Sequence, residues 1–309
     1  GAGGVTVGNK KVTGVLAICY LMFDTRIMKP IRVGVATLLG LAIGVLGGGA
    51  QLIGVFDTWS FRFTDRFFLP HQAEQTTIVV AIDDASLGRI GRWPWPRTVH
   101  ADLIDRLSAF GVKAIGYDVN FPEPSDPGSD AKLAEAVRRS GKVVMPVELN
   151  MSIVQGKLSF RSASMVQSIA EIQSAAAASG FTNIPLDEDN IARRVPLLVR
   201  DSGGSIVHGF AYEMARLVGR APNADVVPVD AYGRFLINFP GEPGRSFRTV
   251  SAADVLQGRV EASVFKDATV FVGATARDLH DYQNVATSRG EPMSGVEIHA
   301  SVYDTLVSQ

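Results

Sequence analysis

The first long hydrophobic stretch of the chain lies between Arg32 and Asp57 and contains no charged residue. An apolar stretch of this length can cross a hydrocarbon core of about 30 Å as a helix, so it predicts a transmembrane helix over residues 33–56. Glycine recurs at every fourth position from 40 to 48, which gives such a helix a face for close packing against a second helix. The alternatives are a buried helix of a soluble protein and an uncleaved export signal.

Positive charge is concentrated before this stretch. A single acid, Asp24, accompanies the basic residues Lys10, Lys11, Arg26, Lys29 and Arg32. Charges of both signs follow the stretch. Because basic residues flank membrane helices on the cytoplasmic side, we expect residues 1–32 in the cytoplasm and residues 57–309 outside the inner membrane of a bacterium, in the periplasm.

Short apolar runs rich in β-branched residues recur from residue 77 onward, as is typical of strands buried on both faces of a sheet. They lie at residues 77–82, 112–117, 143–149 and 268–273. Amphipathic segments separate the first three, and Asp130 is placed to cap the second of the helices that they predict. Strands that alternate with helices through short joints predict a parallel sheet with right-handed crossovers.

The middle of the chain is less regular. Turn residues and alternation predict hairpins at 152–160 and 226–239, a strand at 192–200 and a helix at 206–218. A last helix is expected from near Gly295. We therefore predict an α/β fold in one domain, residues 57–309. Its sheet is mixed and mostly parallel, flanked by helices, with a β-hairpin-rich insertion and one transmembrane helix before it.

Composition narrows the function classes. Charged residues make up 20% of the chain and hydrophobic residues 46%, which indicates a packed core rather than disorder. The formal net charge of −1, without a basic stripe, excludes nucleic acid as an expected partner. The single cysteine, Cys19, precedes the predicted membrane helix. The domain at 57–309 can therefore form neither disulfides nor thiolate metal sites.

Polar residues follow the predicted strands at their carboxyl ends. Asp83 and Asp84 follow the first strand, Asp118 follows the second, and Thr275 comes just after the last. These ends meet at one edge of a parallel sheet, where ligands usually bind. Three carboxylates there could hold a divalent cation or orient a polar ligand. The alternative is that each aspartate caps a loop or a helix. The sequence leaves any cofactor unknown.

The most unusual run is Trp93-Pro94-Trp95-Pro96-Arg97. Two prolines keep this backbone extended, and two indoles are expected to pack somewhere. Trp93, Trp95 and Arg97 could form an aromatic and cationic rim over the crevice beside Asp83 and Asp84. The alternative is a rigid plug over the edge of the sheet.

Other polar groups give weaker signals. Asp187, Asp189 and Asn190 resemble a calcium loop only loosely, so a turn is favoured, and Arg193 and Arg194 are placed to pair with these acids. The histidines show no metal-ligand spacing. No serine sits in a nucleophile elbow, so we assign no catalytic residue.

Several motifs together resemble the type-two CHASE domain. They are AIDDASLGRIGRWPWPRTVHADLIDRLSAFGVKAIGYDVNFPEP, SGFTNIPLDEDNIARRVPLLV, LINFPG, VFVGATARDLHDYQNVATS and MSGVEIHASVYDTL. The resemblance runs from about Phe61 to the C-terminus. It implies an extracytoplasmic sensor that follows a membrane helix and precedes further membrane helices and an output domain. In such proteins that domain is an adenylate or guanylate cyclase, a histidine kinase or a serine/threonine kinase, of which the cyclase is our first expectation. The sequence contains no output domain.

Three functions remain open. The first is a homodimeric sensor that binds an unknown small extracytoplasmic ligand or protein and biases membrane helices between two states. The second is an extracytoplasmic metal-dependent hydrolase that uses Asp83, Asp84 and Asp118. The third is a dimerisation module without a ligand.

Overall fold

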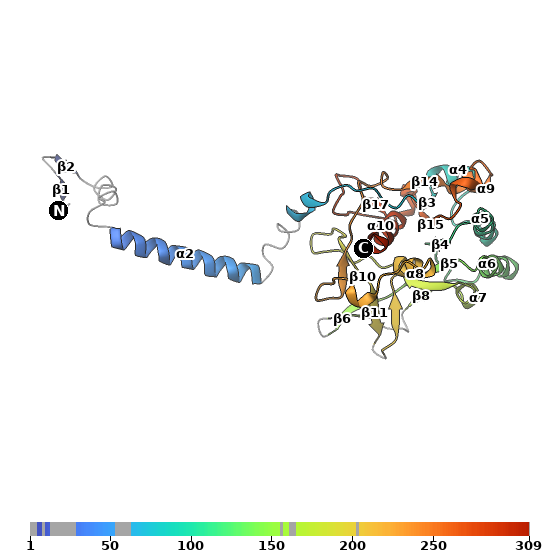
Figure 1. Cartoon of the computed structure of the whole chain (residues 1–309), viewed down its shortest axis with the longest axis horizontal. Helices are drawn as coiled ribbons and strands as arrows, with labels where there is room; N and C mark the ends of the chain where they lie inside the picture. The colour runs from blue at the N-terminus through green and yellow to red at the C-terminus, as the bar shows by residue number, and fades with distance from the viewer. Residues whose placement is uncertain are drawn as a thin grey trace. The chain divides into compact units, whose positions relative to one another are not determined.

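The computed structural model describes residues 5–7, 10–12, 29–52, 63–154, 157–160, 165–201 and 204–308 (Figure 1). The chain divides into two compact units, Gly1–Phe61 and Arg62–Gln309. The second unit begins at Arg62, five residues after the predicted start of the domain at residue 57.

The first unit contains one long helix. Strands β1 (Val5–Val7) and β2 (Lys10–Val12) form an antiparallel pair, and helix α2 spans Lys29–Leu52. The helix predicted from the apolar stretch is therefore present, although residues 53–56 lie outside the described residues. Its apolar side chains are exposed, as at Leu46, which is 73% exposed. None of the helices, as far as the chain is described, combines the length and apolar character needed to cross a membrane. A membrane-spanning role for α2 stays a prediction.

The second unit is built on a mostly parallel sheet. Within the described residues the sheet has seven strands, in the order β14-β3-β15-β4-β5-β8, with β9 pairing with β5. All neighbours are parallel except β8. The strands are β3 (Thr77–Ile82), β4 (Ala114–Tyr117), β5 (Val143–Glu148), β8 (Val166–Gln167), β9 (Ala178–Phe181), β14 (Arg248–Ser251) and β15 (Thr269–Ala274). This confirms the predicted α/β class and the mixed, mostly parallel sheet.

The sheet is buried on both faces because helices cover each of them. Alternate residues of β3 point in opposite directions: Ile78 and Val80 belong to one core cluster and Val79 to another. The first cluster packs under α5 (Arg97–Ala109), α6 (Pro127–Ser140) and α9 (Ala252–Leu256). The second packs under α8 (Phe210–Leu217) and α10 (Gly295–Val307). A strand covered on both sides has no polar face, which explains the continuous apolar runs in the sequence.

The insertion carries smaller sheets. The predicted hairpin at 152–160 is present as β6 (Met151–Val154) and β7 (Lys157–Phe160). These join β11 (Leu198–Asp201) and β12 (Ile206–His208) in a sheet of order β12-β11-β7-β6. The strand predicted at 192–200 is split in two, and its first part is β10 (Arg194–Pro196). The β-hairpin-rich insertion is thus confirmed only in outline.

Three local predictions are wrong. Residues 226–239 form no hairpin, because β13 (Arg234–Leu236) pairs with β10. The segment at 206–218 begins as a strand, since its first residues pair with β11, and becomes helical only at Phe210. Helix α6 is capped by Asp126 rather than Asp130, because Pro127 favours the first helical position.

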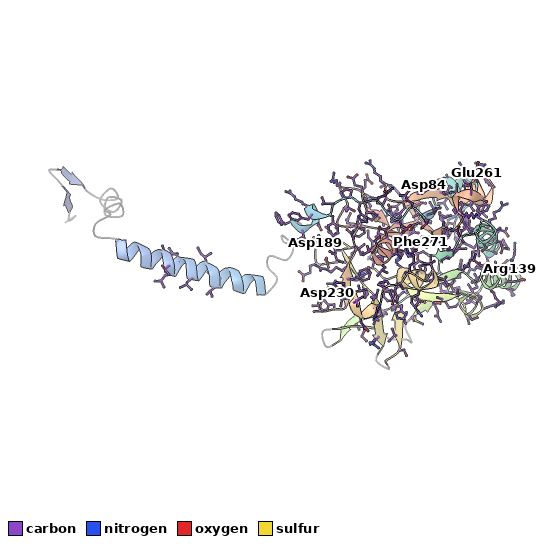
Figure 2. All side chains as sticks on the ribbon, in the orientation of Figure 1. Asp84, Arg139, Asp189, Asp230, Glu261 and Phe271 are labelled. Atoms are coloured by element: carbon purple, nitrogen blue, oxygen red, sulfur yellow. The ribbon has the colours of Figure 1, made fainter. Side chains whose placement is uncertain are left out.

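Helix α10 lies unusually close to the sheet. A Cβ atom at Gly273 of β15 would come within 2.7 Å of the Cβ atom of Val296. Any larger residue at position 273 would therefore push the start of α10 away from the sheet. Figure 1 shows α10 beside the sheet in the second unit, and Figure 2 places Phe271 of β15 near the middle of this unit.

A buried arginine ties the beginning of the second unit to the insertion. Arg193 is 2% exposed and makes two hydrogen bonds of 2.7 Å to Asp65. It also bonds both carboxylate oxygens of Asp189 and one of Asp187. Arg194 pairs with Asp187 as well. The predicted pairing of these arginines with Asp187 and Asp189 is thus confirmed. Both carboxylates already have arginine partners within the protein.

Replacing Arg193 by alanine is expected to destabilise the second unit strongly. The variant removes the arginine that pairs with the carboxylates of Asp65 and Asp189, and breaking a buried ion pair in this way typically costs about 3–5 kcal/mol. The free energy of unfolding in urea measures this loss. Arg245→Ala is the control, because Arg245 is 79% exposed and pairs with Glu242 at the surface, and it should leave stability essentially unchanged. Equal stability of the two variants would contradict the anchoring role of Arg193.

Candidate ligand-binding site at the carboxyl end of the sheet

The aspartate pair after β3 has a capping role. Asp83 is the N-cap of α4 (Asp84–Ile90) and accepts hydrogen bonds of 2.8 Å from the backbone N–H of Ser86 and the hydroxyl of Ser251. Asp84 is exposed in the first turn of the helix, where its charge is favourable with the helix dipole. These contacts favour the capping alternative for both residues.

The tryptophan run packs against the protein rather than over a crevice. Trp95 is 2% exposed, and its indole N–H donates to the carbonyl of Gly91 at 2.9 Å. Trp93 packs edge-on against Trp95 and His100. Arg97 binds Asp130 and the carbonyl of Glu123, and its guanidinium lies 4.5 Å from the centre of the Phe121 ring. These contacts favour the rigid-plug alternative for Trp93, Trp95 and Arg97.

Asp118 belongs to a separate group of ionisable side chains. Its carboxylate lies 3.8 Å from Nε2 of His299 on α10. Burial raises the pKa of Asp118 to about 7 and lowers the pKa of His299 to about 4. Burial, reinforced by the charge of Asp118, raises the pKa of Asp281 to about 6. Burial therefore shifts both acids towards their neutral form and keeps the histidine neutral, so the group has no strong internal ion pair.

The structure gives no support to a metal site at these aspartates. Across the described ranges, no three histidine, cysteine, aspartate or glutamate side chains are close enough to hold a metal ion. Asp83 and Asp84 lie at the start of α4, whereas Asp118 faces α10. The strands that carry them are separated by β15.

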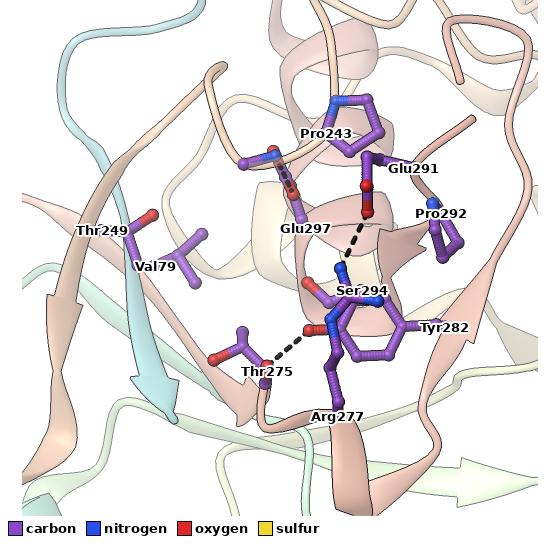
Figure 3. A pocket seen from close by; sticks show the side chains of 11 residues that line it. Val79, Pro243, Thr249, Thr275, Arg277, Tyr282, Glu291, Pro292, Ser294 and Glu297 are labelled. Carbon is purple, nitrogen blue, oxygen red and sulfur yellow. Dashed lines mark hydrogen bonds and ion pairs between the residues drawn. The ribbon is translucent and has the colours of Figure 1, made fainter. Parts of the chain in front are cut away.

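Thr275 does line a cavity. This cavity has a volume of about 290 Å³ and lies between the sheet edge and the start of α10. Figure 3 shows the side chains that surround it. The lining residues are Val79, Pro243, Gly244, Thr249, Thr275, Arg277, Tyr282, Glu291, Pro292, Ser294 and Glu297. The volume is near the lower end of the range of about 300–1,000 Å³ for small-molecule sites.

The polar walls of the cavity are held by a few contacts. The Tyr282 hydroxyl donates to the carbonyl of Thr275, and Arg277 pairs with Glu291 at 2.8 Å (Figure 3). Glu297, in the first turn of α10, accepts a bond of 2.9 Å from the N–H of Gly244 at each carboxylate oxygen. Burial raises the pKa of Glu297. The cavity therefore combines a buried acid with an exposed ion pair.

Comparison with known families decides what kind of domain this is. A model of the CHASE2 domain matches residues 36–309. The chain belongs to the CHASE2 family. CHASE2 domains are extracytoplasmic sensory domains of signalling proteins. Neither the curated proteins nor the solved structures contain a match to the chain.

The cavity residues of this CHASE2 domain could be only partly recognised in the sequence. Thr275 was identified by its position after a buried strand, but Arg277, Tyr282, Glu291 and Glu297 were not. Arg277 and Tyr282 lie in the segment ATARDLHDYQ and Glu297 in MSGVEIHASVYDTL, whereas Glu291 precedes the second segment. For Glu297 the available signal is an ionisable residue inside a mostly apolar final helix.

Helix α10 extends from the cavity to the first residues of the domain. Two turns beyond Glu297, the fully buried carboxylate of Asp304 accepts a bond of 2.7 Å from the N–H of Glu74. Nε2 of His71 lies 3.1 Å from the same carboxylate. Arg220 binds both Glu74 and the carbonyl of Val307. The beginning of the domain and the end of α10 are thus held together.

The raised pKa of Asp118 predicts a pH-dependent effect of Asp118→Asn. The folded domain holds this proton more tightly than the unfolded chain, so the contribution of Asp118 to stability falls as the pH rises from about 4 to about 7. The variant should be more stable than the wild type at about pH 8, by at most about 4 kcal/mol. The difference should vanish near pH 4.

Urea unfolding of both proteins across this pH range measures the difference. The lowered pKa of His299 acts with the opposite sign below its unfolded value, but it acts in both proteins. Asp278→Asn on the neighbouring exposed loop is the matched control. A constant difference between wild type and Asp118→Asn at every pH would contradict the assignment.

Proposed function

We propose that this CHASE2 domain is the sensory input part of a bacterial transmembrane receptor and that the cavity beside α10 receives its stimulus. The observation that carries the proposal is the position of the cavity. It adjoins the carboxyl end of β15 at Thr275 and reaches Val79 and Thr249 within β3 and β14. The carboxyl ends of parallel strands are where open α/β sheets bind their ligands. One wall is formed by the first turn of a helix that is buried along its length.

The membrane arrangement is part of the proposal. Helix α2 is mostly apolar, exposes the side chains of Leu38, Leu39, Leu41 and Leu46, and begins within a positively charged segment. We place it across the inner membrane of a bacterium, with residues 57–309 in the periplasm. The recurring glycines from 40 to 48 support packing of two such helices in a homodimer.

The resemblance to signalling proteins supports a nucleotide cyclase as the output domain, so that the receptor regulates cyclic nucleotide synthesis. A histidine kinase or a serine/threonine kinase is the alternative. A hydrolase that uses Asp83, Asp84 and Asp118 is not favoured, because the contacts of Asp83 are those of a helix cap.

The contacts of α10 support a route for the signal. A ligand that moves the first turn of the helix also strains the bonds of Asp304 two turns away, since a helix moves as a rigid element. Those bonds hold the beginning of the domain. A ligand biases such a system only by its differential affinity for two states.

Cysteine labelling in intact cells tests the sidedness of the domain. Asp84 is exposed at the surface of the second unit (Figure 2), so Asp84→Cys in a Cys19→Ser background should react with a maleimide that cannot cross the inner membrane. The wild type is the matched control. Its Cys19 is expected on the cytoplasmic side and should react only after the membrane is permeabilised. Reaction of Asp84→Cys only after permeabilisation would overturn the proposal.

A further inference from the structure

The inner wall of the cavity carries an acid without a cationic partner. Glu297 is 7% exposed, and the hydrogen bonds to its carboxylate come from the backbone, from the N–H of Gly244 and from Ser246. In the described part of the chain, none of the ion pairs involves Glu297. By contrast, the carboxylates of Asp65, Asp187 and Asp189 pair with Arg193, and that of Asp118 lies beside His299. A buried carboxylate of this kind gains most from an ammonium group that enters the cavity.

The mouth of the cavity carries the complementary charge. The side chains of Arg277 and Glu291 pair at 2.8 Å while they are 74% and 69% exposed. An ion pair so accessible to water is weak and easily exchanged. A carboxylate on a ligand can therefore replace Glu291 as the partner of Arg277. Such a carboxylate can form a bidentate pair with the guanidinium.

The described residues that line the cavity place no cation beside Glu297. Asp281 lies at the start of α10, where its carbonyl accepts from the N–H of Gly295, and its side chain adjoins Gly295. Asp118 and His299 lie next to it, and the histidine is neutral. Among the described residues that line the cavity, Arg277 at the mouth is the only one with a positive charge. The inner wall therefore carries an acid without a cation beside it, and the rim carries the basic group.

We propose that this cavity binds a small zwitterion of the amino-acid type, with its ammonium group on Glu297 and its carboxylate on Arg277. The inference deepens the proposed sensory function and rests on it. Glu297, Ser294 and Thr275 supply oxygen atoms on the inner wall, whereas Arg277 supplies the fork of donors at the mouth. The volume of about 290 Å³ admits a small side chain in addition to these two groups.

Thermal unfolding and calorimetric titration of the full chain in detergent test this proposal. The probes are the common L-amino acids, one at a time, with propylamine and propionate as single-charge analogues. At least one amino acid should raise the unfolding temperature, because a ligand of the folded state stabilises it. Each single-charge analogue should bind that site at least about tenfold more weakly.

Two variants place the ligand in the cavity. Glu297→Gln keeps the acceptor for Gly244 but removes the charge, and it should weaken binding by about 30-fold or more. Arg277→Gln, at the exposed mouth, should weaken it by about three- to tenfold. Glu261→Gln and Arg259→Gln are the matched controls, because they change exposed residues outside the cavity, and they should bind as the wild type does.

The outcomes separate this inference from the proposed function. If no amino acid shifts the unfolding temperature, or if folded Glu297→Gln binds as tightly as the wild type, the ligand class is wrong. The sensory role would then still be judged by the labelling of Asp84→Cys. If propylamine binds as tightly as the best amino acid, the assignment of Arg277 is wrong.

Discussion

The structure depends on the burial of one helix, α10, that carries several polar side chains. All residues of α10 from Gly295 to Leu306 are buried, yet the helix carries Glu297, His299, Ser301, Asp304 and Thr305. A buried polar group without a partner costs far more than a hydrogen bond gains, so each of these side chains must be satisfied by the chain around it. The segments that satisfy them are thereby fixed in place.

The spacing of these residues explains which segments are fixed. Glu297, Ser301, Asp304 and Thr305 follow the positions i, i+4, i+7 and i+8, so they form one stripe on the helix. Gly244 binds one end of the stripe and Asn238 binds the other through Thr305. The backbone N–H of His71 donates to the carbonyl of Pro240. The loop of residues 238–244 and the beginning of the domain therefore lie along the same stripe, which connects the cavity to the end of the helix.

Much of the fold, but little of the site, could be predicted from the sequence. The strands at 77–82 and 143–148 were recognisable because burial on both faces leaves a continuous apolar run. The order of strands was not, since the position of β15 between β3 and β4 depends on contacts far apart in the chain. Asp83, Trp95 and Arg97 were plausible ligand residues by position, but local capping and packing account for them. Glu297 was hidden because the polar stripe of α10 is itself buried, whereas a polar stripe in a sequence is typical of a solvent-exposed helix face.

The central claim is that α10 couples the cavity to the beginning of the domain. Hydrogen exchange at the amides of Gly244 and Glu74, with and without the amino acid that binds best, tests it most directly. The account predicts that the ligand changes exchange at both amides together in the wild type and at neither in Glu297→Gln. A ligand that changes exchange at Gly244 while leaving Glu74 unaffected would contradict it.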